Sequence, residues 1–276
     1  MTNFRIQRPC KELADYVRFF WNLEAKVESV APFVHRALPD NCLELIFYCR
    51  GQLAISSEDG AEGFTFSSGV FGQAQKYRLF TAEQDFTLFG VYLYPVSFNA
   101  LFGLPASELT NQKIDSQTLW GGEGKVLEEK VMLAGDDTAR VKIVTNFLLD
   151  RIKRKSAMRD LGFVKRLNGI VESNVVTSIP SLVNDFNLSR RQFERKFKEY
   201  SGFSPKEFFK IVRFKNAMRE SARGDKSLAQ IAIECGYYDQ SHFTLEFKKY
   251  SGYSPREYSL NNLEAPDPRA TRDFKG

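Results

Sequence analysis

The sequence predicts an α+β protein in which an N-terminal β-barrel domain with accessory helices is followed by an all-α domain. Three observations support this fold class. Residues 16–95 hold short runs rich in Phe, Tyr, Val and Ile that glycines separate, as in strands joined by turns. Beyond residue 160 the apolar residues recur at helical spacing. Within that helical part, the stretches 193–208 and 243–258 are two copies of one sequence pattern.

The domain limits follow from these changes of pattern. With 276 residues, the chain is long enough for two domains that each bury a core. We expect a β-rich domain with closing helices at 1–155 and a helical domain at 156–260. The polar, basic run RIKRKSAMRD at 151–160 is the expected linker. Residues 261–276 lack apolar periodicity and are an expected disordered tail.

In the N-terminal part, three runs carry the strand prediction: LELIFYC at 43–49, FTFSSGVFG at 64–72 and FTLFGVYLYP at 86–95. An all-β barrel or sandwich is the natural interpretation. After Pro95 the period changes, and residues 96–102 and about 125–154 carry apolar side chains at helical spacing. These helices are expected either to close the barrel or to mediate dimerisation.

Four helix starts are marked in the C-terminal part by a serine followed three residues later by Glu or Gln. This spacing forms a capping box, in which the two side chains satisfy each other's backbone N–H groups. Two of the four also place proline at the first helical position, where its missing N–H costs nothing. The four pairs are Ser189 with Gln192, Ser204 with Glu207, Ser227 with Gln230 and Ser254 with Glu257.

The duplication organises the helical domain. FERKFKEYSGFSPKEF at 193–208 aligns with FTLEFKKYSGYSPREY at 243–258 at an offset of 50, which chance does not produce. Each copy is preceded by another amphipathic helix and a short turn, which contains Asn187 in the first copy and Gly236 in the second. Both residue types tolerate the left-handed conformation that such a turn requires. A helix-turn-helix is therefore predicted twice, with residues 205–222 as one long helix between the units.

Periodicity separates the buried from the exposed face of the repeated helix. The aromatic residues at equivalent positions share one face and are expected in the core: Phe193, Phe197, Tyr200, Phe243, Phe247 and Tyr250. The other face and its flanks hold the candidate contact residues, which are Arg190, Arg191, Glu194, Arg195 and Lys198 in the first copy and Gln240, Ser241, Thr244, Leu245 and Lys248 in the second.

The chemistry of these exposed side chains suits the major groove of DNA. Arg can pair with guanine through two hydrogen bonds, Glu can accept from cytosine, and an apolar side chain can touch the thymine methyl group. We expect the first unit to carry more of the specificity, because the second presents mostly small or apolar side chains. The competing interpretation is that Arg191, Glu194 and Arg195 only solvate a helix and that Leu245 is an ordinary surface leucine.

The charge distribution points to the same kind of partner. Residues 156–260 hold 18 Lys and Arg against 12 Asp and Glu, whereas the rest of the chain holds 21 against 22. The net charge of +5 is therefore concentrated in the helical part. Such an asymmetry indicates a polyanionic partner.

Residues 160–260 resemble the DNA-binding domain of AraC-type transcriptional regulators, most clearly in SLAQIAIECGYYDQSHFTLEFKKYSGYSPREY and RFKNAMRESARGDKSLAQIA. The resemblance implies two helix-turn-helix units joined by a helix, with recognition through the second helix of each. Transferred residue by residue, the base-reading positions fall on Arg191, Glu194, Arg195, Ser241 and Leu245. The family commonly has Arg where this chain has Leu245, so the second unit is expected to read DNA weakly.

The N-terminal domain resembles a divergent cupin-like barrel, on the segments HRALPDNCLELIF, FGQAQKY and FGVYLYPVSFNALFG. In AraC-type regulators this domain senses a small molecule, dimerises, or does both. A pocket for a polar effector would use His35, Arg36, Asp40, Glu44 and Gln73. The alternative is that Asp40 and Asn41 form a turn and the other residues stand at strand ends.

A metal-dependent cupin enzyme is the competing function class. The chain has only His35 and His242, so a site with three histidines is impossible, and no catalytic constellation, metal site or cofactor motif is evident. We expect a cytoplasmic transcriptional activator that binds double-stranded DNA and contacts RNA polymerase, with a small-molecule effector and a homodimer as further partners and no membrane association. The alternative is an architectural nucleic-acid-binding protein without sequence preference.

Overall fold

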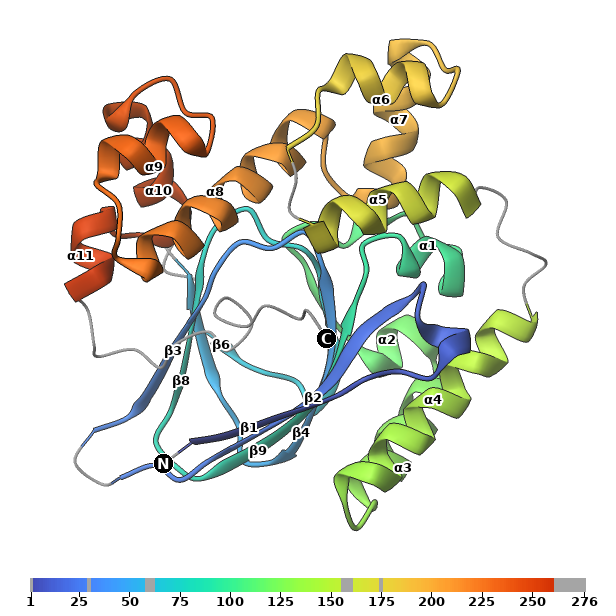
Figure 1. The fold of residues 1–276 in the computed structure, drawn as a ribbon. Helices are drawn as coiled ribbons and strands as arrows, with labels where there is room; N and C mark the ends of the chain where they lie inside the picture. The colour runs from blue at the N-terminus through green and yellow to red at the C-terminus, as the bar shows by residue number, and fades with distance from the viewer. Residues whose placement is uncertain (1, 29–30, 58–62, 155–160, 174–175, 261–276) are drawn as a thin grey trace.

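The computed structural model describes residues 2–28, 31–57, 63–154, 161–173 and 176–260. Two antiparallel sheets enclose a barrel-like N-terminal domain, four described α-helices cover its outside, and a helical domain rests on one end of it (Figure 1). This arrangement confirms the predicted α+β class and the order of its two parts. No helix in these ranges combines the length and the apolar character needed to cross a bilayer.

The larger sheet has six strands in the order β1-β2-β9-β4-β7-β10, and the smaller has four in the order β3-β8-β5-β6. The strands of the first are β1 Thr2–Gln7, β2 Val17–Ala25, β9 Phe86–Leu93, β4 Leu43–Arg50, β7 Ser68–Phe71 and β10 Lys113–Asp115. The strands of the second are β3 Phe33–Ala37, β8 Arg78–Ala82, β5 Ala54–Ser57 and β6 Gly63–Phe64. The three apolar runs predicted as strands hold β4, β7 and β9, whereas β1 lies ahead of the region predicted to be β-rich.

The central strands β4, β7 and β9 of the larger sheet are mostly apolar because both faces of the sheet are buried there. Side chains alternate between the faces of a strand, so Phe19 and Trp21 of β2 belong to the barrel interior while Phe20 belongs to a second core outside it. That outer core lies beneath α1 Ser97–Phe102, α2 Ser116–Trp120, α3 Gly122–Met132 and α4 Asp137–Arg154. The predicted helices after Pro95 therefore close the barrel.

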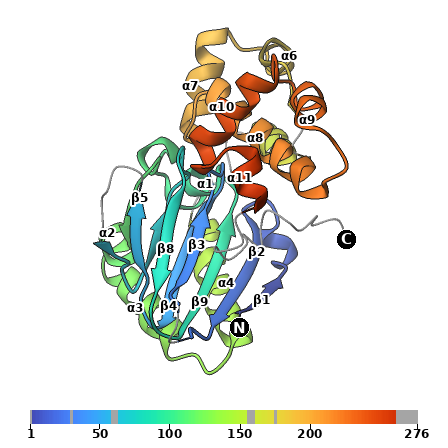
Figure 2. The same ribbon diagram turned by 90° about the vertical axis from the view of Figure 1, so that its left-hand side faces the viewer.

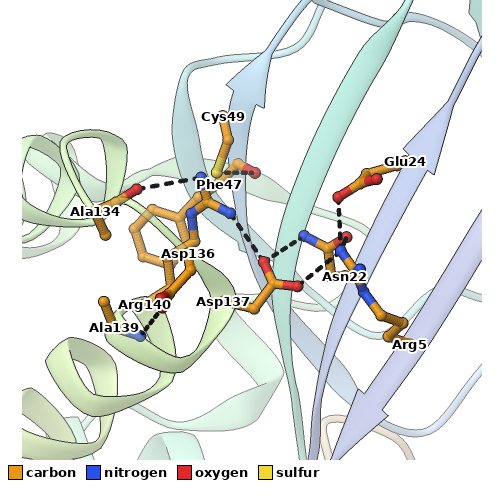
Figure 3. A network of polar contacts seen from close by, with 10 residues as sticks. All are labelled: Arg5, Asn22, Glu24, Phe47, Cys49, Ala134, Asp136, Asp137, Ala139 and Arg140. Atoms are coloured by element: carbon orange, nitrogen blue, oxygen red, sulfur yellow. Dashed lines mark hydrogen bonds and ion pairs between the residues drawn. The ribbon is translucent and has the colours of Figure 1, made fainter.

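The start of α4 is tied to β1 and β2 by a polar network (Figure 3). The Asp137 carboxylate accepts hydrogen bonds from Asn22 at 2.9 Å and Arg140 at 2.9 Å, and it forms an ion pair with Arg5 at 3.0 Å. Arg5 also pairs with Glu24 at 2.6 Å. A groove of about 660 Å³ is lined by these residues together with Trp21 and neighbouring side chains.

The helical domain consists of seven helices within the described ranges: α5 Leu161–Ser173, α6 Ile179–Asp185, α7 Arg190–Ser201, α8 Pro205–Arg223, α9 Leu228–Glu234, α10 Gln240–Ser251 and α11 Pro255–Leu260. Capping boxes form at Ser189 and Ser227 as predicted, and Ser254 exchanges the same two bonds with Glu257. At Ser204 the serine accepts from the Glu207 backbone, but the Glu207 carboxylate accepts from the hydroxyl of Tyr250 at 3.0 Å.

The linker predicted at 151–160 needs one correction. Residues 151–154 are the last turn of α4 rather than linker, since Ile152 packs on the outer core. The remaining linker residues, 155–160, and the predicted tail, 261–276, lie outside the described residues. One hydrophobic cluster contains both barrel-interior residues and the core of the helical domain, so the two domains share buried surface.

Candidate nucleic-acid interface

The helical domain contains two helix-turn-helix units, α6 with α7 and α9 with α10. The turn of the first has Asn187 at a φ of 50°, and that of the second has Gly236 at 77°. Both residues adopt the left-handed conformation predicted for them, which Asn and Gly reach at little cost. In each unit the second helix begins at a side-chain cap, Ser189 for α7 and Asp239 for α10. The cap at Asp239 was not predicted.

The two second helices bury one face and expose the other, as their periodicity predicts. The six core aromatics are each no more than 7% exposed: Phe193, Phe197, Tyr200, Phe243, Phe247 and Tyr250. The candidate contact residues are exposed, apart from a half-buried Thr244: Arg190, Arg191, Glu194, Arg195, Lys198, Gln240, Ser241, Leu245 and Lys248. Figure 2 shows α7 and α10 above the two sheets, in the part of the molecule remote from the chain's first strand.

The candidate contact residues of α7 are four basic side chains and one acidic side chain. Arg190 pairs with Glu194 one turn later at 3.0 Å, and both side chains are largely solvated. An exposed pair of this kind contributes little to stability, so DNA can replace it at small cost. The exposed guanidinium groups provide the donor forks that guanine and phosphate accept.

Among the candidate contact residues of α10, Lys248 carries a charge and the other four are neutral. Leu245 is 72% exposed, and the Thr244 hydroxyl donates to the Gln240 carbonyl at 2.9 Å. Tyr238, which precedes the capping Asp239, is 90% exposed and was not singled out from the sequence. This surface offers apolar contact and single hydrogen bonds rather than paired arginine contacts.

An ion pair that sequence reasoning missed fixes α10 on α8. The Arg213 guanidinium donates to both carboxylate oxygens of Glu246, at 2.8 and 3.0 Å, and to the Gly236 carbonyl at 3.2 Å. Its carbon also lies 4.5 Å from the centre of the Tyr237 ring. Burial raises the pKa of Tyr237, so its phenol stays neutral beside this pair. At an offset of 50, the first unit has Phe163 and Lys196 in these places, with the ammonium 5.1 Å from the ring centre.

The helix α8 sets the separation of the two units. It is one helix over Pro205–Arg223, as predicted, and its 19 residues span roughly 28 Å at about 1.5 Å each. One turn of B-DNA is roughly 34 Å long. The spacing therefore suits two recognition helices in successive major grooves on one side of a duplex.

The five residues predicted for an effector pocket are not brought together. Asp40 and Glu44 line a cavity of about 40 Å³ inside the barrel, together with Cys42. His35 lies half-buried between the rings of Phe33 and Phe80. The side chains of Arg36 and Gln73 are buried against the helical domain instead. The cavity has room for water but not for a molecule of metabolite size.

Comparisons with known proteins agree with this architecture. Residues 182–261 match a family described as a helix-turn-helix domain, and residues 5–115 match a domain of unknown function, DUF6597. The HTH-type transcriptional activator RhaS of Shigella sonnei is 25% identical over 203 residues, which cover 66% of this chain and 72% of RhaS. RhaS of Pectobacterium carotovorum is 30% identical over 83 residues, so this chain spans only 30% of that relative.

Among solved structures, ToxT from Vibrio cholerae is 14% identical, with a TM-score of 0.47 over 96% of this chain and 99% of ToxT. A transcriptional regulator with an AraC-type DNA-binding domain from Chromobacterium violaceum is 28% identical, with a TM-score of 0.31 over 35% of this chain and 87% of that one.

Proposed function

The chain is a transcriptional regulator with an AraC-type helix-turn-helix DNA-binding domain, and from this premise we propose that it activates transcription at a bipartite site read by α7 and α10. This identity answers the choice between a regulator and a metal-dependent enzyme in favour of the regulator. The observation that carries the proposal is the pair of exposed faces at equivalent positions of two helices, which are joined through α8, a helix roughly 28 Å long.

In this proposal the base contacts come from Arg191, Glu194 and Arg195 in one groove and from Ser241 and Leu245 in the next. Arg190, Gln240, Thr244 and the lysines Lys198 and Lys248 flank these positions and contact the sugar-phosphate backbone or further bases. Since four of the five basic candidates lie on α7, the first half-site contributes most of the discrimination.

Selection of bound duplexes from a random pool by the full chain tests the proposal. We expect a motif with two half-sites about one helical turn apart. Arg195→Ala should degrade one half-site, whereas Arg154→Ala removes an equal charge from α4, where the side chain is 60% exposed and pairs with Glu123, and should leave the motif intact. Binding without enrichment would favour the architectural alternative.

Salt dependence separates the two functions further. Sequence-independent binding rests on phosphate contacts and falls for all duplexes alike as salt rises. Sequence-specific binding should persist for the selected site at salt concentrations that abolish binding to random DNA. Equal salt sensitivity of the two duplexes would contradict direct reading of bases.

For a small-molecule effector, we propose the groove between β1, β2 and α4 rather than the residues predicted from the sequence. Its volume of about 660 Å³ is that of a small-molecule site, and Arg5, Asn22 and Arg140 supply polar groups for a small polar ligand. Trp21 also borders the groove, although its side chain packs in the barrel interior, and the chain has one other tryptophan. In a Trp120→Phe variant, a ligand from a panel of sugars, amino acids and small carboxylic acids should change the remaining fluorescence. Binding without such a change would place the effector elsewhere.

The other proposed partners follow from the activator role. RNA polymerase is the partner that an activator contacts in the cytoplasm. For a homodimer, we propose the outward side of α3 and the residue that ends it, where Val126 is 47% and Leu133 is 86% exposed. Sedimentation equilibrium should then give a dimer that Leu133→Asp dissociates, and a monomeric wild-type chain would rule the dimer out.

A further inference from the structure

Both recognition helices rest their C-terminal ends on the barrel, at equivalent positions of the repeat. α7 ends in Ser201-Gly202 and α10 in Ser251-Gly252, and both glycines have positive φ, 80° and 81°. In each turn the serine hydroxyl accepts from the backbone N–H two residues later, at 3.2 Å. The two turns have the same local structure, and each exposes its serine carbonyl to the N-terminal domain.

The first turn is held by Gln73, in the loop between β7 and β8. The Gln73 amide donates to the carbonyls of Ser201 at 3.2 Å and Ala106 at 2.9 Å. The hydroxyl of Thr110 donates to the Gly202 carbonyl at 2.9 Å. Gln73 is 1% exposed, and a Cβ on Gly202 would overlap its amide nitrogen. The contact therefore requires glycine at this position.

The second turn is held by Arg36 of β3 in the same way. Its guanidinium donates to the Ser251 carbonyl at 3.1 Å and to the Tyr253 hydroxyl at 3.0 Å. The guanidinium is also sandwiched between the rings of Tyr77 and Tyr253, at 4.2 and 4.3 Å from their centres. A Cβ on Gly252 would stand 2.6 Å from the Tyr77 ring, so this turn too requires glycine.

Between the two turns, α8 is seated on the same end of the barrel. Lys215 pairs with Asp40 at 2.8 Å, and both side chains are about four-fifths buried. The Asn41 amide donates to the Phe208 carbonyl at 3.4 Å. The Asp40 carboxylate also accepts a hydrogen bond from Tyr92 inside the barrel. The barrel thus contacts both recognition-helix turns and the helix between them, and α5 and α7 make further contacts with the N-terminal domain through Asn168 and Glu199.

We infer that Arg36 and Gln73 are positioning residues for DNA recognition, which hold α7 and α10 at one relative placement and so restrict the spacing of the two half-sites. The inference rests on the proposed bipartite reading. Neither residue touches the exposed faces, so each acts through the turn that it holds. The 72–77 loop contributes to both contacts, through Gln73 to the first unit and through Tyr77 to the second.

The geometry of DNA makes this restriction measurable. Insertion of one base pair between the half-sites moves one of them by about 3.4 Å and turns it by about 34° around the axis. Two recognition helices that are each docked on a rigid barrel cannot follow this change together. If the two helices were joined only by α8 and the short turn that precedes α8, they could adapt to the changed spacing.

Binding to the selected site and to duplexes with one or two base pairs inserted or deleted tests the inference in the full chain. The wild type should lose about tenfold in affinity for each change of one base pair, equivalent to about 1.4 kcal/mol. Gly202→Ala, Arg36→Ala and Gln73→Ala should reduce that loss to less than about threefold. The preferred bases within each half-site should stay the same.

Gly224→Ala is the matched control for Gly202→Ala. Gly224 has the same helix-terminal role at a φ of 72°, with open space where a Cβ would stand. The Gly224→Ala substitution therefore introduces similar backbone strain without touching the barrel, and this variant should keep the wild-type spacing profile. If Gly202→Ala does not fold, the spacing profiles of Arg36→Ala and Gln73→Ala test the inference.

Two outcomes would overturn the inference. One is a spacing profile in Arg36→Ala and Gln73→Ala identical to that of the wild type, and the other is a wild type that tolerates all spacings. Failure of the proposed function looks different, because the wild type would then enrich no motif at all.

Discussion

Loss of the buried Arg213–Glu246 ion pair should destabilise the second helix-turn-helix unit far more than loss of the equivalent contact in the first. Glu246→Ala is the informative change. Glu246 is 7% exposed and accepts three hydrogen bonds from one guanidinium, at 2.8, 3.0 and 3.2 Å. The substitution leaves Arg213 with the Gly236 carbonyl and the Tyr237 ring as its remaining contacts in this network.

The magnitude follows from the burial of the two groups. Removal of one member of a fully buried ion pair costs about 3–5 kcal/mol, because the other charge is left without compensation. The Arg213 side chain is 19% exposed, so water reaches part of it and the cost should lie about 1 kcal/mol below that range. We expect a loss of about 2–4 kcal/mol in the free energy of unfolding. In a chain of this size each kcal/mol lowers the Tm by about 2–4 °C.

Urea unfolding followed by circular dichroism measures the effect, with two comparisons. Lys196→Ala changes the equivalent position of the first unit, where an ammonium lies over the Phe163 ring, and should cost less than about 1 kcal/mol. Replacement of both Arg213 and Glu246 by Met should cost less than Glu246→Ala alone, since no buried charge remains. A loss below about 0.5 kcal/mol for Glu246→Ala, or equal losses for Glu246→Ala and Lys196→Ala, would refute the reasoning.

Three further predictions use other parts of the chain. Arg195→Ala should weaken binding to the selected site by about 1–3 kcal/mol without a change in Tm, and an equal loss on random DNA would count against a base contact. Gly236→Val should destabilise the domain by about 1–3 kcal/mol because a β-branched residue is strained at a φ of 77°, whereas a wild-type Tm would contradict the turn assignment. Burial raises the pKa of Cys42 to about 12, so an alkylating reagent at pH 8 should modify the exposed Cys10 quickly and Cys42 only on unfolding. Comparable modification rates of the two cysteines, measured by mass spectrometry, would exclude this burial.

The sequence predicts the helical domain well because its signals are local. Serine caps, the glycine or asparagine of a turn and the recurrence of aromatics all act within a few residues. The two turns at Asn187 and Gly236 and the long α8 follow from such signals alone. The apolar runs of β4 and β9 are equally clear, since burial of both sheet faces leaves few polar positions in them.

The contacts that sequence reasoning missed are long-range. Arg36 and Ser251 are 215 residues apart, and Gln73 and Ser201 are 128 apart. A polar residue near a strand end looks the same in sequence whether it faces a ligand or another domain, so Arg36 and Gln73 were assigned to an effector pocket. Arg213 and Glu246 sit on two helices whose relative rotation no local pattern specifies. Strand β1 is an edge strand next to β2, and its alternation of exposed and half-buried residues gives a weak apolar signal.

The docking of both Ser-Gly turns bears on the construction of chimeric regulators. In such a chimera, the helical domain would be replaced, at a junction near residue 155, by that of another regulator. If the incoming domain were chosen only for the DNA site that it binds, its contacts with this barrel would not be considered. The graft would then succeed only if the incoming domain also ended both recognition helices in Ser-Gly and carried a residue equivalent to Tyr253 for the Arg36 guanidinium. The unit that must be exchanged together is therefore Arg36, the 72–77 loop and the two Ser-Gly turns, not either domain by itself.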